Sequence, residues 1–569
     1  MLTKLTIRNF KLFDEVEIEL GDRVVLVGPN NGGKTSALQA LALWDVGVKR
    51  WSEKRGTGDV PEKRPGVTIN RRDLISLPLP AANHLWRDLH TQHSSRENGP
   101  QKVFVDVVVE GVTGGQLWQC GLEFYYANEE SFYCRSLRLP GGGRMDVPAV
   151  ATDVRVAYLP PMSGLGATET RLDQGAINVR LGEGRTAEVL RNLCYQVVQS
   201  EGGESRWQAL TKRLDELFGI TIEAPEYIRE RGEIVMSYRT RKGIRLDISA
   251  SGRGQQQTLL LLAHMTANPG SVLLLDEPDA HLEVLRQRQI YQVLTETARQ
   301  TNSQIIAASH SEVLLNEAAD RDVVIAFVGK PHRIDDRGSQ VQKALREIGF
   351  EHYYQAEETG WVLYLEGATD LAILRALAKL LAHEAAEVLE RPFVHYVANQ
   401  PRKAQEHFYA LREAKGDLVA MALYDRLDQP LPNDPNLRQT MWSRRELENY
   451  LCSRDTLLAF AHAQGQLQQG ELFGASWRNA MQESIGEIEA ALASLGRPSP
   501  WGDDIKASDE FLDPLFKKFY DKLSLPNLMR KTDYHTLSPF VAVENIGAEV
   551  IEKLDLIVKT AGSATPRST

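Results

Sequence analysis

The chain has 569 residues, of which 42% are hydrophobic and 25% are charged; this composition is typical of globular domains and excludes collagen, coiled-coil rods and wholesale disorder. Lysine and arginine number 66, and aspartate and glutamate 76, so the formal net charge is −10 and any contact with nucleic acid would depend on local basic patches. The four cysteines form no CxxC pair, which predicts buried thiols in a reducing compartment. We find no signal peptide and no apolar run that could span a bilayer, so we expect a soluble cytoplasmic protein without a membrane partner.

Strands and helices alternate through the first 350 residues, which predicts one α/β domain over residues 1–350. Strands are predicted at Lys4–Arg8, Val16–Leu20, Val24–Val27, Val103–Glu110, Leu117–Tyr126, Val154–Tyr158, Ile220–Glu223, Glu233–Arg239, Val272–Asp276 and Gln304–Ala308. Helices are predicted through Trp44, from about Gln255, and at Leu282–Arg299. The βαβ alternation implies a sheet with parallel central strands.

A basic insertion of about residues 45–100 interrupts this pattern. Its first part, Lys49–Arg72, has weak periodicity and is predicted to be an exposed loop. Its cations could contact phosphates, but a solvated loop is an equal alternative because no aromatic residues are interleaved for base stacking. The basic residues are Lys49, Arg50, Lys54, Arg55, Lys63, Arg64, Arg71 and Arg72.

A second domain is predicted over residues 355–560, with a parallel sheet and a mostly helical C-terminal part. The strand WVLYLEG (361–367) precedes an apolar helix at Thr369–His383, and another strand, Leu418–Leu423, follows. The last residues, 561–569, are predicted to be disordered.

A phosphate-binding loop is predicted after the strand Val24–Val27. Residues 28–35, GPNNGGKT, match G-x-x-x-x-G-K-[ST] in the strand-to-helix context that the motif requires, so a plain Gly-rich turn is the weaker alternative. Lys34 would reach the β- and γ-phosphates of ATP, and Thr35 would ligate Mg²⁺. The predicted ATP-binding residues are Gly28, Asn30, Asn31, Gly32, Gly33, Lys34, Thr35 and Ser36.

Two later strands end in residues that suit ATP hydrolysis. The apolar run of SVLLLDEPDAHLE (271–283) ends in Asp276 and Glu277; Asp276 would hold Mg²⁺, and Glu277 would orient or deprotonate the attacking water. The strand in QIIAASHS (304–311) ends at His310, where it could sense the γ-phosphate, although a lone histidine is usually structural.

A fourth segment, ISASGRGQQQTLLLL (248–262), places small residues before an apolar helix, which is either an anion-binding helix start or a plain capped loop. With the three preceding motifs it resembles the ABC-type ATPase head. The resemblance gives Asp276 and Glu277 the Walker B roles, 279–282 the D-loop and His310 the switch role. It also implies that Ser251, Gly252 and Gly254 bind the nucleotide of a partner head, with Ser249 as an alternative serine, so we expect a dimer or tetramer.

A cluster of carboxylates is predicted in the second domain. Glu366 ends one strand, Asp370 follows four residues later, and Asp425 and Asp428 follow the next strand. Parallel neighbouring strands would bring Glu366 and Asp425 together, and oxygen ligands alone favour Mg²⁺ or Mn²⁺. Singly, Asp370 could be a helix N-cap and Asp425 a solvated strand end.

The EGxxD pattern with a later acidic strand end resembles the Toprim domain. Behind an ABC-type head it resembles the OLD family of ATPase–Toprim nucleases, including the nuclease subunits of Gabija-type anti-phage systems. By this resemblance Glu446 and Glu448 in WSRRELENYL (442–451) are metal ligands. It also makes Lys531 a phosphate-contacting cation, with Lys506 as its rival. The family shows D-x-D after the second strand, whereas here the spacing is Asp425-x-x-Asp428.

The resemblance therefore implies an ATP-regulated, Mg²⁺- or Mn²⁺-dependent DNA endonuclease in bacterial anti-phage defence, working as a homo-oligomer and with a companion protein. Its catalytic residues would be Glu277, His310, Glu366 and Lys531. The alternative is an ATPase scaffold with a degenerate Toprim domain that regulates a separate effector, as Septu-type ATPases work beside an HNH nuclease. A topoisomerase or primase is weaker, because the chain has no room for the additional machinery that these need.

Overall fold

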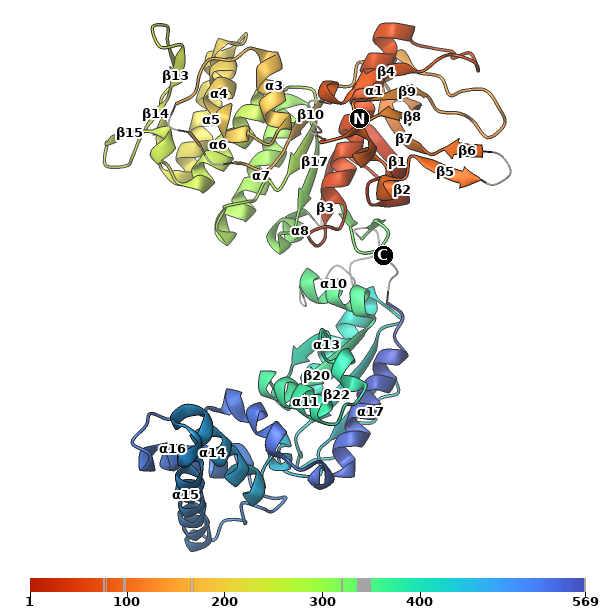
Figure 1. The fold of residues 1–569 in the computed structure, drawn as a ribbon. Coiled ribbons are helices and arrows are strands. Elements are labelled where there is room, and N and C mark those ends of the chain that lie inside the picture. Colours follow the sequence, from red (N-terminus) through yellow and green to blue (C-terminus); the bar gives the residue numbers. More distant parts are fainter. Residues whose placement is uncertain are drawn as a thin grey trace. The chain divides into compact units, whose positions relative to one another are not determined.

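The computed structural model describes residues 1–74, 77, 79–95, 99–163, 165–166, 168–318, 321–334 and 349–566. The chain divides into two compact units, Met1–Gln342 and Lys343–Ser568 (Figure 1). Their boundary falls in a segment outside the described residues, 335–348, a few residues before the predicted one. Of the predicted disordered tail, 567–569 also lie outside the described residues, whereas 561 and 562 finish a helix.

The first unit contains an antiparallel sheet in the strand order β2-β1-β7-β8-β9-β4. Its strands alternate buried and exposed residues, because one face packs on the core. The strands are β1 (Leu2–Phe10), β2 (Phe13–Glu19), β4 (Val67–Asn70), β7 (Phe104–Thr113), β8 (Gln116–Asn128) and β9 (Ser131–Ser136). A separate hairpin pairs β5 (Gln92–Ser95) with β6 (Gly99–Lys102).

A second sheet in this unit has the order β10-β16-β17-β3-β18-β19, and all its pairs except β18–β19 are parallel. This confirms the predicted parallel central strands. The strands are β3 (Arg23–Val27), β10 (Val156–Leu159), β16 (Val272–Asp276), β17 (Gln304–Ser309), β18 (Val323–Ala326) and β19 (His332–Arg333).

Helices cover both faces of the parallel sheet. Helix α1 (Lys34–Arg55) packs in one core with the antiparallel sheet and alternate side chains such as Leu274 and Ile306. Helices α6 (Arg253–Ala267) and α7 (Val284–Thr301) share the other core with the intervening side chains, such as Leu275 (Figure 1). Strand β16 is buried at every position, as its continuous apolar run requires.

Helix α1 is longer than predicted. The expected end at Trp44 and the expected loop from Lys49 are wrong for residues 45–55, which are helical. The reason is that Trp44, Val48 and Trp51 continue one apolar stripe at helical spacing and are buried. Strand β4 also lies within the predicted insertion, so part of that segment completes the antiparallel sheet.

Shorter elements complete the first unit. The helices are α2 (Ala149–Thr152), α3 (Gln174–Gly182), α4 (Leu190–Gln199), α5 (Gly203–Phe218) and α8 (Glu312–Ala318). Two small antiparallel sheets pair β11 (Thr221–Ile222), β14 (Ser237–Arg239) and β15 (Arg245–Asp247), and β12 (Glu226–Ile228) with β13 (Glu233–Val235).

The second unit contains a parallel sheet in the order β21-β20-β22-β23. Its strands are β20 (Trp361–Leu365), β21 (Val394–Tyr396), β22 (Val419–Tyr424) and β23 (Leu437–Met441). Helices α10 (Phe350–Thr359) and α13 (Pro401–Ala414) pack on one face. Helices α11 (Ala368–Leu380) and α17 (Ala548–Gly562) pack on the other, with α12 (Ala385–Val388) beside them (Figure 1).

The remainder of this unit is helical, as predicted. Helices α14 (Arg454–Gln469), α15 (Gly474–Ser494) and α16 (Asp513–Lys522) pack together around buried Trp477 and Phe516. A 3-10 segment, Lys531–Phe540, packs against α11 and α14. None of the helices that the structure describes combines the length and the apolarity that crossing a membrane requires.

Candidate nucleotide and carboxylate sites

The loop between β3 and α1 encloses the side chain of Lys34. Its ammonium group is buried and donates to the carbonyl oxygens of Gly28 and Pro29, each at 2.7 Å. Burial lowers the pKa of Lys34 from its ordinary value. An anion in the loop would give this desolvated cation a stronger partner than the two neutral carbonyls. The first turn of α1 supplies N–H groups beside it, so the loop is built to bind phosphate.

Two glycines of this loop have positive φ angles and leave no room for a Cβ atom, so both the backbone conformation and the packing require glycine there. Gly33 has φ of +96°, and a Cβ there would lie 2.8 Å from the ring of Phe13. Gly28 has φ of +153°, and its Cβ would lie 2.7 Å from the carbonyl oxygen of Phe327. The loop therefore packs between β2 and the chain after β18, and side chains at these positions would distort it.

We expect Gly33→Ala to abolish ATP binding and to lower the free energy of unfolding by about 2–4 kcal/mol, because backbone strain and overpacking add. Gly56, which follows α1, is a matched control: its φ is also positive, at +79°, but a Cβ there meets open space. Gly56→Ala should cost about 1–3 kcal/mol, from backbone strain without overpacking, and should retain ATP binding. Nucleotide titration and urea unfolding of both variants measure this difference, and equal effects would contradict it.

Asp276 and Thr35 lie together at the end of β16. The Thr35 hydroxyl donates to Asp276 Oδ1 at 3.2 Å, and the Tyr158 hydroxyl donates to Oδ2 at 3.2 Å. Burial raises the pKa of Asp276. Two neighbouring ligands of an octahedral Mg²⁺ lie about 3 Å apart, so Thr35 and Asp276 fit one ion, as the sequence predicts.

Glu277 and His310 face each other beside this pair. His310 Nδ1 lies 3.5 Å from Glu277 Oε1, and the two side chains are 55% and 33% exposed. Glu277 has a φ of +49°, which is uncommon for a non-glycine residue and sets the turn that follows β16. The exposed carboxylate is accessible to a water molecule. Behind it, buried Asp279 accepts from Ser309 at 2.8 Å, which fixes the turn.

The predicted signature loop, 248–254, lies at the start of α6. Ser251 is buried and donates to the carbonyl oxygen of Ile248 at 2.7 Å, whereas Ser249 is half-buried and donates to Asp247 at 2.6 Å. The geometry therefore favours Ser249 for contact with an external phosphate. Gly252 is the N-cap of α6 and has open space around it.

In the second unit, the carboxyl ends of neighbouring strands bring together Glu366 and Asp425. The Asn399 amide bridges them: its Nδ2 donates to Glu366 Oε2 at 2.6 Å and to Asp425 Oδ2 at 3.3 Å. The backbone N–H groups of Asp425 and Leu447 complete the arrangement, donating to Asn399 Oδ1 and Asp425 Oδ1. Burial and the adjacent Glu366 carboxyl raise the pKa of Asp425 well above its ordinary value. A cation at this point would relieve the repulsion.

Asp370 and Glu448 extend the group. Asp370 accepts from the N–H groups of Glu366 and Gly367, at 2.9 and 3.2 Å. The N-cap of α11 is Gly367 and Asp370 is at N3, so the N-cap alternative is wrong in position, although its carboxylate does cap the start of the helix. Burial raises the pKa of Asp370 to about 6 and that of Glu448 to about 7. Each carboxyl also experiences the charge of the other acids and of Lys531.

The carboxylate of Glu446 makes its hydrogen bonds outside this group. It is buried and accepts from the backbone N–H and the hydroxyl of Ser508, at 2.9 and 3.1 Å. The Ser508 hydroxyl also accepts from Lys531 at 3.1 Å, and Lys506 lies 3.5 Å from Glu446. Lys506 pairs closely with Asp509. The charge of Lys531 lowers the pKa values of Asp370 and Glu448, whereas Lys506 interacts with Asp509 and Glu446.

Asp428 is a predicted ligand that the structure places at the surface, away from the group. Its side chain is 86% exposed and pairs with Arg445 at 3.0 Å. The two residues between Asp425 and Asp428 carry it out of the crevice, whereas a D-x-D spacing would return it to the same side. In the described part of the chain, no three of the predicted carboxylates have ligand oxygens within 4.8 Å of one another, so the group is more open than a preformed three-ligand site.

Three site residues were missed from the sequence: Tyr158, Asn399 and Ser508. Asn399 follows β21 as Glu366 follows β20 and Asp425 follows β22, so a polar residue after the third strand was a usable signal. The short strand Val394–Tyr396 was not predicted, and the signal was lost with it. Tyr158 and Ser508 reach their sites through tertiary packing and carry no local motif.

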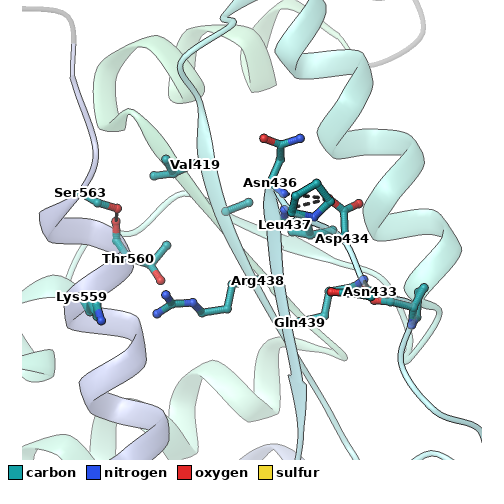
Figure 2. A pocket seen from close by; sticks show the side chains of 13 residues that line it. Val419, Asn433, Asp434, Asn436, Leu437, Arg438, Gln439, Lys559, Thr560 and Ser563 are labelled. Atoms are coloured by element: carbon teal, nitrogen blue, oxygen red, sulfur yellow. Dashed lines mark hydrogen bonds between the residues drawn. The ribbon is translucent and has the colours of Figure 1, made fainter.

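A cavity lies elsewhere in this unit. It has a volume of about 450 Å³ and lies at the amino ends of β22 and β23, opposite the carboxylates. Figure 2 shows Arg438 of β23 and Lys559, Thr560 and Ser563 of the α17 region around it. In α/β sheets ligands bind at the carboxyl ends of the strands, so the carboxylate group is the better candidate.

The basic cluster of the first unit is partly neutralised. Lys49 pairs with Asp45 at 2.7 Å, and Arg71 pairs with Glu130 at 2.9 Å. Arg50 lies 3.2 Å from both Glu53 and Asp73. These ion pairs reduce the local positive potential that a DNA contact needs, and they support the solvated alternative.

Comparison with known proteins gives two partial family matches. Residues 1–45 match the family described as "AAA ATPase domain", and residues 211–316 match "AAA domain, putative AbiEii toxin, Type IV TA system". No curated protein matches the chain. Between them the two matched ranges contain the phosphate loop, the 248–254 loop, Asp276 and Glu277, and His310. Together with the geometry of Lys34 and Asp276, these matches indicate an ATPase domain in the first unit.

Solved structures with some similarity include head domains of SMC proteins. The SMC head domain from Thermotoga maritima is 16% identical over 58% of this chain and 98% of that chain, with a TM-score of 0.32. The Smc head domain with an extended coiled coil bound to the C-terminal domain of ScpA, from Pyrococcus furiosus, is 14% identical over 61% and 99%, with a TM-score of 0.36. Scores at this level do not establish a shared fold.

Proposed function

We propose that this chain is an ATP-regulated, Mg²⁺- or Mn²⁺-dependent DNA endonuclease of the OLD type. In this proposal the first unit is an ABC-type head that dimerises around ATP, and the second is a Toprim-like nuclease. The toxin wording of the family that matches residues 211–316 supports a role in bacterial defence against phage, with a companion protein.

The observation that carries the proposal is the bridged pair Glu366–Asn399–Asp425 at the carboxyl ends of three parallel strands. Two half-buried carboxyl groups this close together are unfavourable when both are ionised, unless something neutralises them. Their oxygen-only chemistry suits a hard divalent cation. A purely structural strand end would have no need for two carboxylates on one amide.

The two sites have distinct tasks. When bound, Mg²⁺ or Mn²⁺ would stabilise the attacking and leaving oxygens of a phosphodiester. Asn399 positions the Glu366 and Asp425 carboxylates relative to each other, and Lys531 offers a positive charge beside them. In the first unit Lys34 binds the phosphates of ATP, Thr35 and Asp276 hold its Mg²⁺, and Glu277 takes the proton of the attacking water with His310 beside it.

Plasmid cleavage by the purified full chain tests the proposal. We expect nicking or linearisation with Mg²⁺ or Mn²⁺, none with EDTA, and a different rate when ATP is present. Cleavage rates with ATP and with a non-hydrolysable analogue show whether ATP activates or inhibits the nuclease. No cleavage under any of these conditions would contradict the nuclease.

Lys531 and Lys506 should differ in their effect on cleavage. We expect Lys531→Met to slow cleavage by roughly a hundredfold, since it removes the cation that acts on Asp370 and Glu448. Lys506→Met removes an exposed pair with Asp509 and should change the rate less than about threefold. Initial rates at saturating Mn²⁺ measure both, and the reverse order would assign the role to Lys506.

A second function is favoured by one observation, the displacement of Asp428 to the surface. In that case the second unit would be a degenerate scaffold, and the ATPase would assemble with and regulate a separate effector. Wild-type protein that hydrolyses ATP without cutting DNA would support this function over the first.

A further inference from the structure

Three histidines lie close together in the second unit, on the face of its parallel sheet that α10 and α13 cover. His352 comes from α10, His395 from β21 and His407 from α13. If one nitrogen is taken from each ring, the three nitrogens lie within 4.8 Å of one another. Over the described ranges of the chain, this is the one group of three His, Cys, Asp or Glu residues that meets that spacing. No sequence motif joins these residues, since each comes from a different element.

Specific contacts hold the rings. His352 Nδ1 and His407 Nε2 lie 2.9 Å apart, and the Tyr364 hydroxyl lies 2.9 Å from His407 Nδ1. Tyr364 is paired in register with His395 across β20 and β21, so both project from the same face of the sheet. The tyrosine hydroxyl thus occupies the outer nitrogen of His407 and leaves Nε2 directed at the other two histidines.

The electrostatic state of the rings suits ligation. Burial lowers the pKa of His395 to about 4 and that of His407 to about 3. Both imidazoles are therefore neutral near pH 7, which is the form that coordinates metal. All three side chains are only half-buried, so ions and a water ligand can reach them from solution.

We propose that His352, His395 and His407 form a transition-metal site, with Tyr364 as the hydrogen-bond partner that orients His407. Three imidazoles without a carboxylate or thiolate select Zn²⁺, Co²⁺, Ni²⁺ or Cu²⁺ over Mg²⁺ and Mn²⁺. Water would supply the fourth position, as in other three-histidine sites. The site is therefore chemically distinct from the carboxylate group.

Binding requires two small changes. The rings of His395 and His407 stack at 3.8 Å with an angle of 4°, and a shared ion must lie in the plane of each ring, so one ring turns. The proton between His352 Nδ1 and His407 Nε2 moves to the other nitrogen of its own ring, by tautomerisation through water. Both facing nitrogens then carry lone pairs, and no net proton is released. The bound ion would tie α10 to β21 and α13.

The full chain, produced without a histidine tag and stripped with a chelator, tests the site with Zn²⁺ and Co²⁺. We expect about one tightly bound Zn²⁺ per chain, a visible Co²⁺ absorption band and a Zn²⁺-dependent rise in Tm. His352→Gln and His407→Ala should lose all three. Tyr364→Phe should weaken Zn²⁺ binding by roughly 10–100-fold, because the outer partner of a ligating imidazole is removed.

His383→Gln is the matched control, since His383 lies in the same unit but pairs with Asp555. Circular dichroism confirms folding first, and His352→Gln, at the half-buried ring of α10, is the milder variant. Equal Zn²⁺ content and Tm response in wild type and folded His352→Gln would overturn the site. Loss of Zn²⁺ in Glu366→Gln with retention in His352→Gln would overturn it too, by placing the ion on the carboxylates.

Discussion

The Glu277→Gln variant is expected to bind ATP and to hydrolyse it about 10²–10⁴-fold more slowly than wild type, because a general base is lost while the phosphate loop is unchanged. Glu277 is the exposed acid of the pair at the end of β16, whereas Asp276 is buried and occupied by Thr35 and Tyr158. An amide of the same shape keeps the contact with His310 but cannot accept the proton. The same substitution should therefore trap the ATP-bound state.

Trapping should be visible as a change in mass. If the 248–254 loop binds the nucleotide of another copy, Glu277→Gln with ATP should remain a dimer or larger, while nucleotide-free protein has a lower mass in light scattering. Glu283→Gln, at the exposed N-cap of α7, is the matched control and should hydrolyse ATP normally. A Glu277→Gln protein whose mass is the same with and without ATP would contradict the paired-head arrangement.

The position of the serines sharpens this expectation. The Ser251 hydroxyl donates to the carbonyl oxygen of Ile248 within the loop. The side chain of Gln256 donates to the carbonyl oxygens of Ile248, Ser249 and Ser251. These hydrogen bonds hold the loop in shape without a nucleotide. The half-buried Ser249 and the open N-cap at Gly252 remain at its surface. A preformed anion site costs little ordering on binding, which favours a nucleotide-dependent contact between copies.

The nucleotide site was predictable from sequence because its parts are local. A strand, a glycine turn and a helix start are contiguous at residues 24–36, and the apolar run before Asp276 marks a buried strand by itself. Even here the sequence missed Tyr158, which reaches Asp276 from β10 through a parallel pairing that no local pattern encodes.

The carboxylate group was predictable only in part, since it depends on which strands are neighbours. Glu366 and Asp425 were placed correctly by the rule that parallel strands end at one edge. Asn399 was missed because its strand has three residues, too few to show a period. The histidine group shows the limit of local patterns: its members are spread over 56 positions, from residue 352 to 407, and only the packing of α10 and α13 on one sheet face brings them together.

Glu366→Gln is expected to lower DNA cleavage by roughly a thousandfold, since loss of a metal-binding carboxylate removes several kcal/mol of transition-state stabilisation. The amide oxygen can still accept from Asn399, so the crevice should keep its shape. ATP hydrolysis should stay at the wild-type rate because its residues lie in the other unit. Quantified plasmid cleavage beside an ATPase assay measures both activities on one preparation.

Asp428→Asn is the control that makes this result specific, because it removes the same charge at a site that the structure places in solvent. Its pair with Arg445 is exposed and worth about 1 kcal/mol or less, so folding and cleavage should be nearly unchanged. If Glu366→Gln is inactive and Asp428→Asn active, the working group is the buried one bridged by Asn399. If both are inactive, the 425–428 turn must close over the metal, and the aspartate spacing does not weaken the site. If both cut as well as wild type, the carboxylates are not the nuclease, and cleavage must come from elsewhere or from a contaminant.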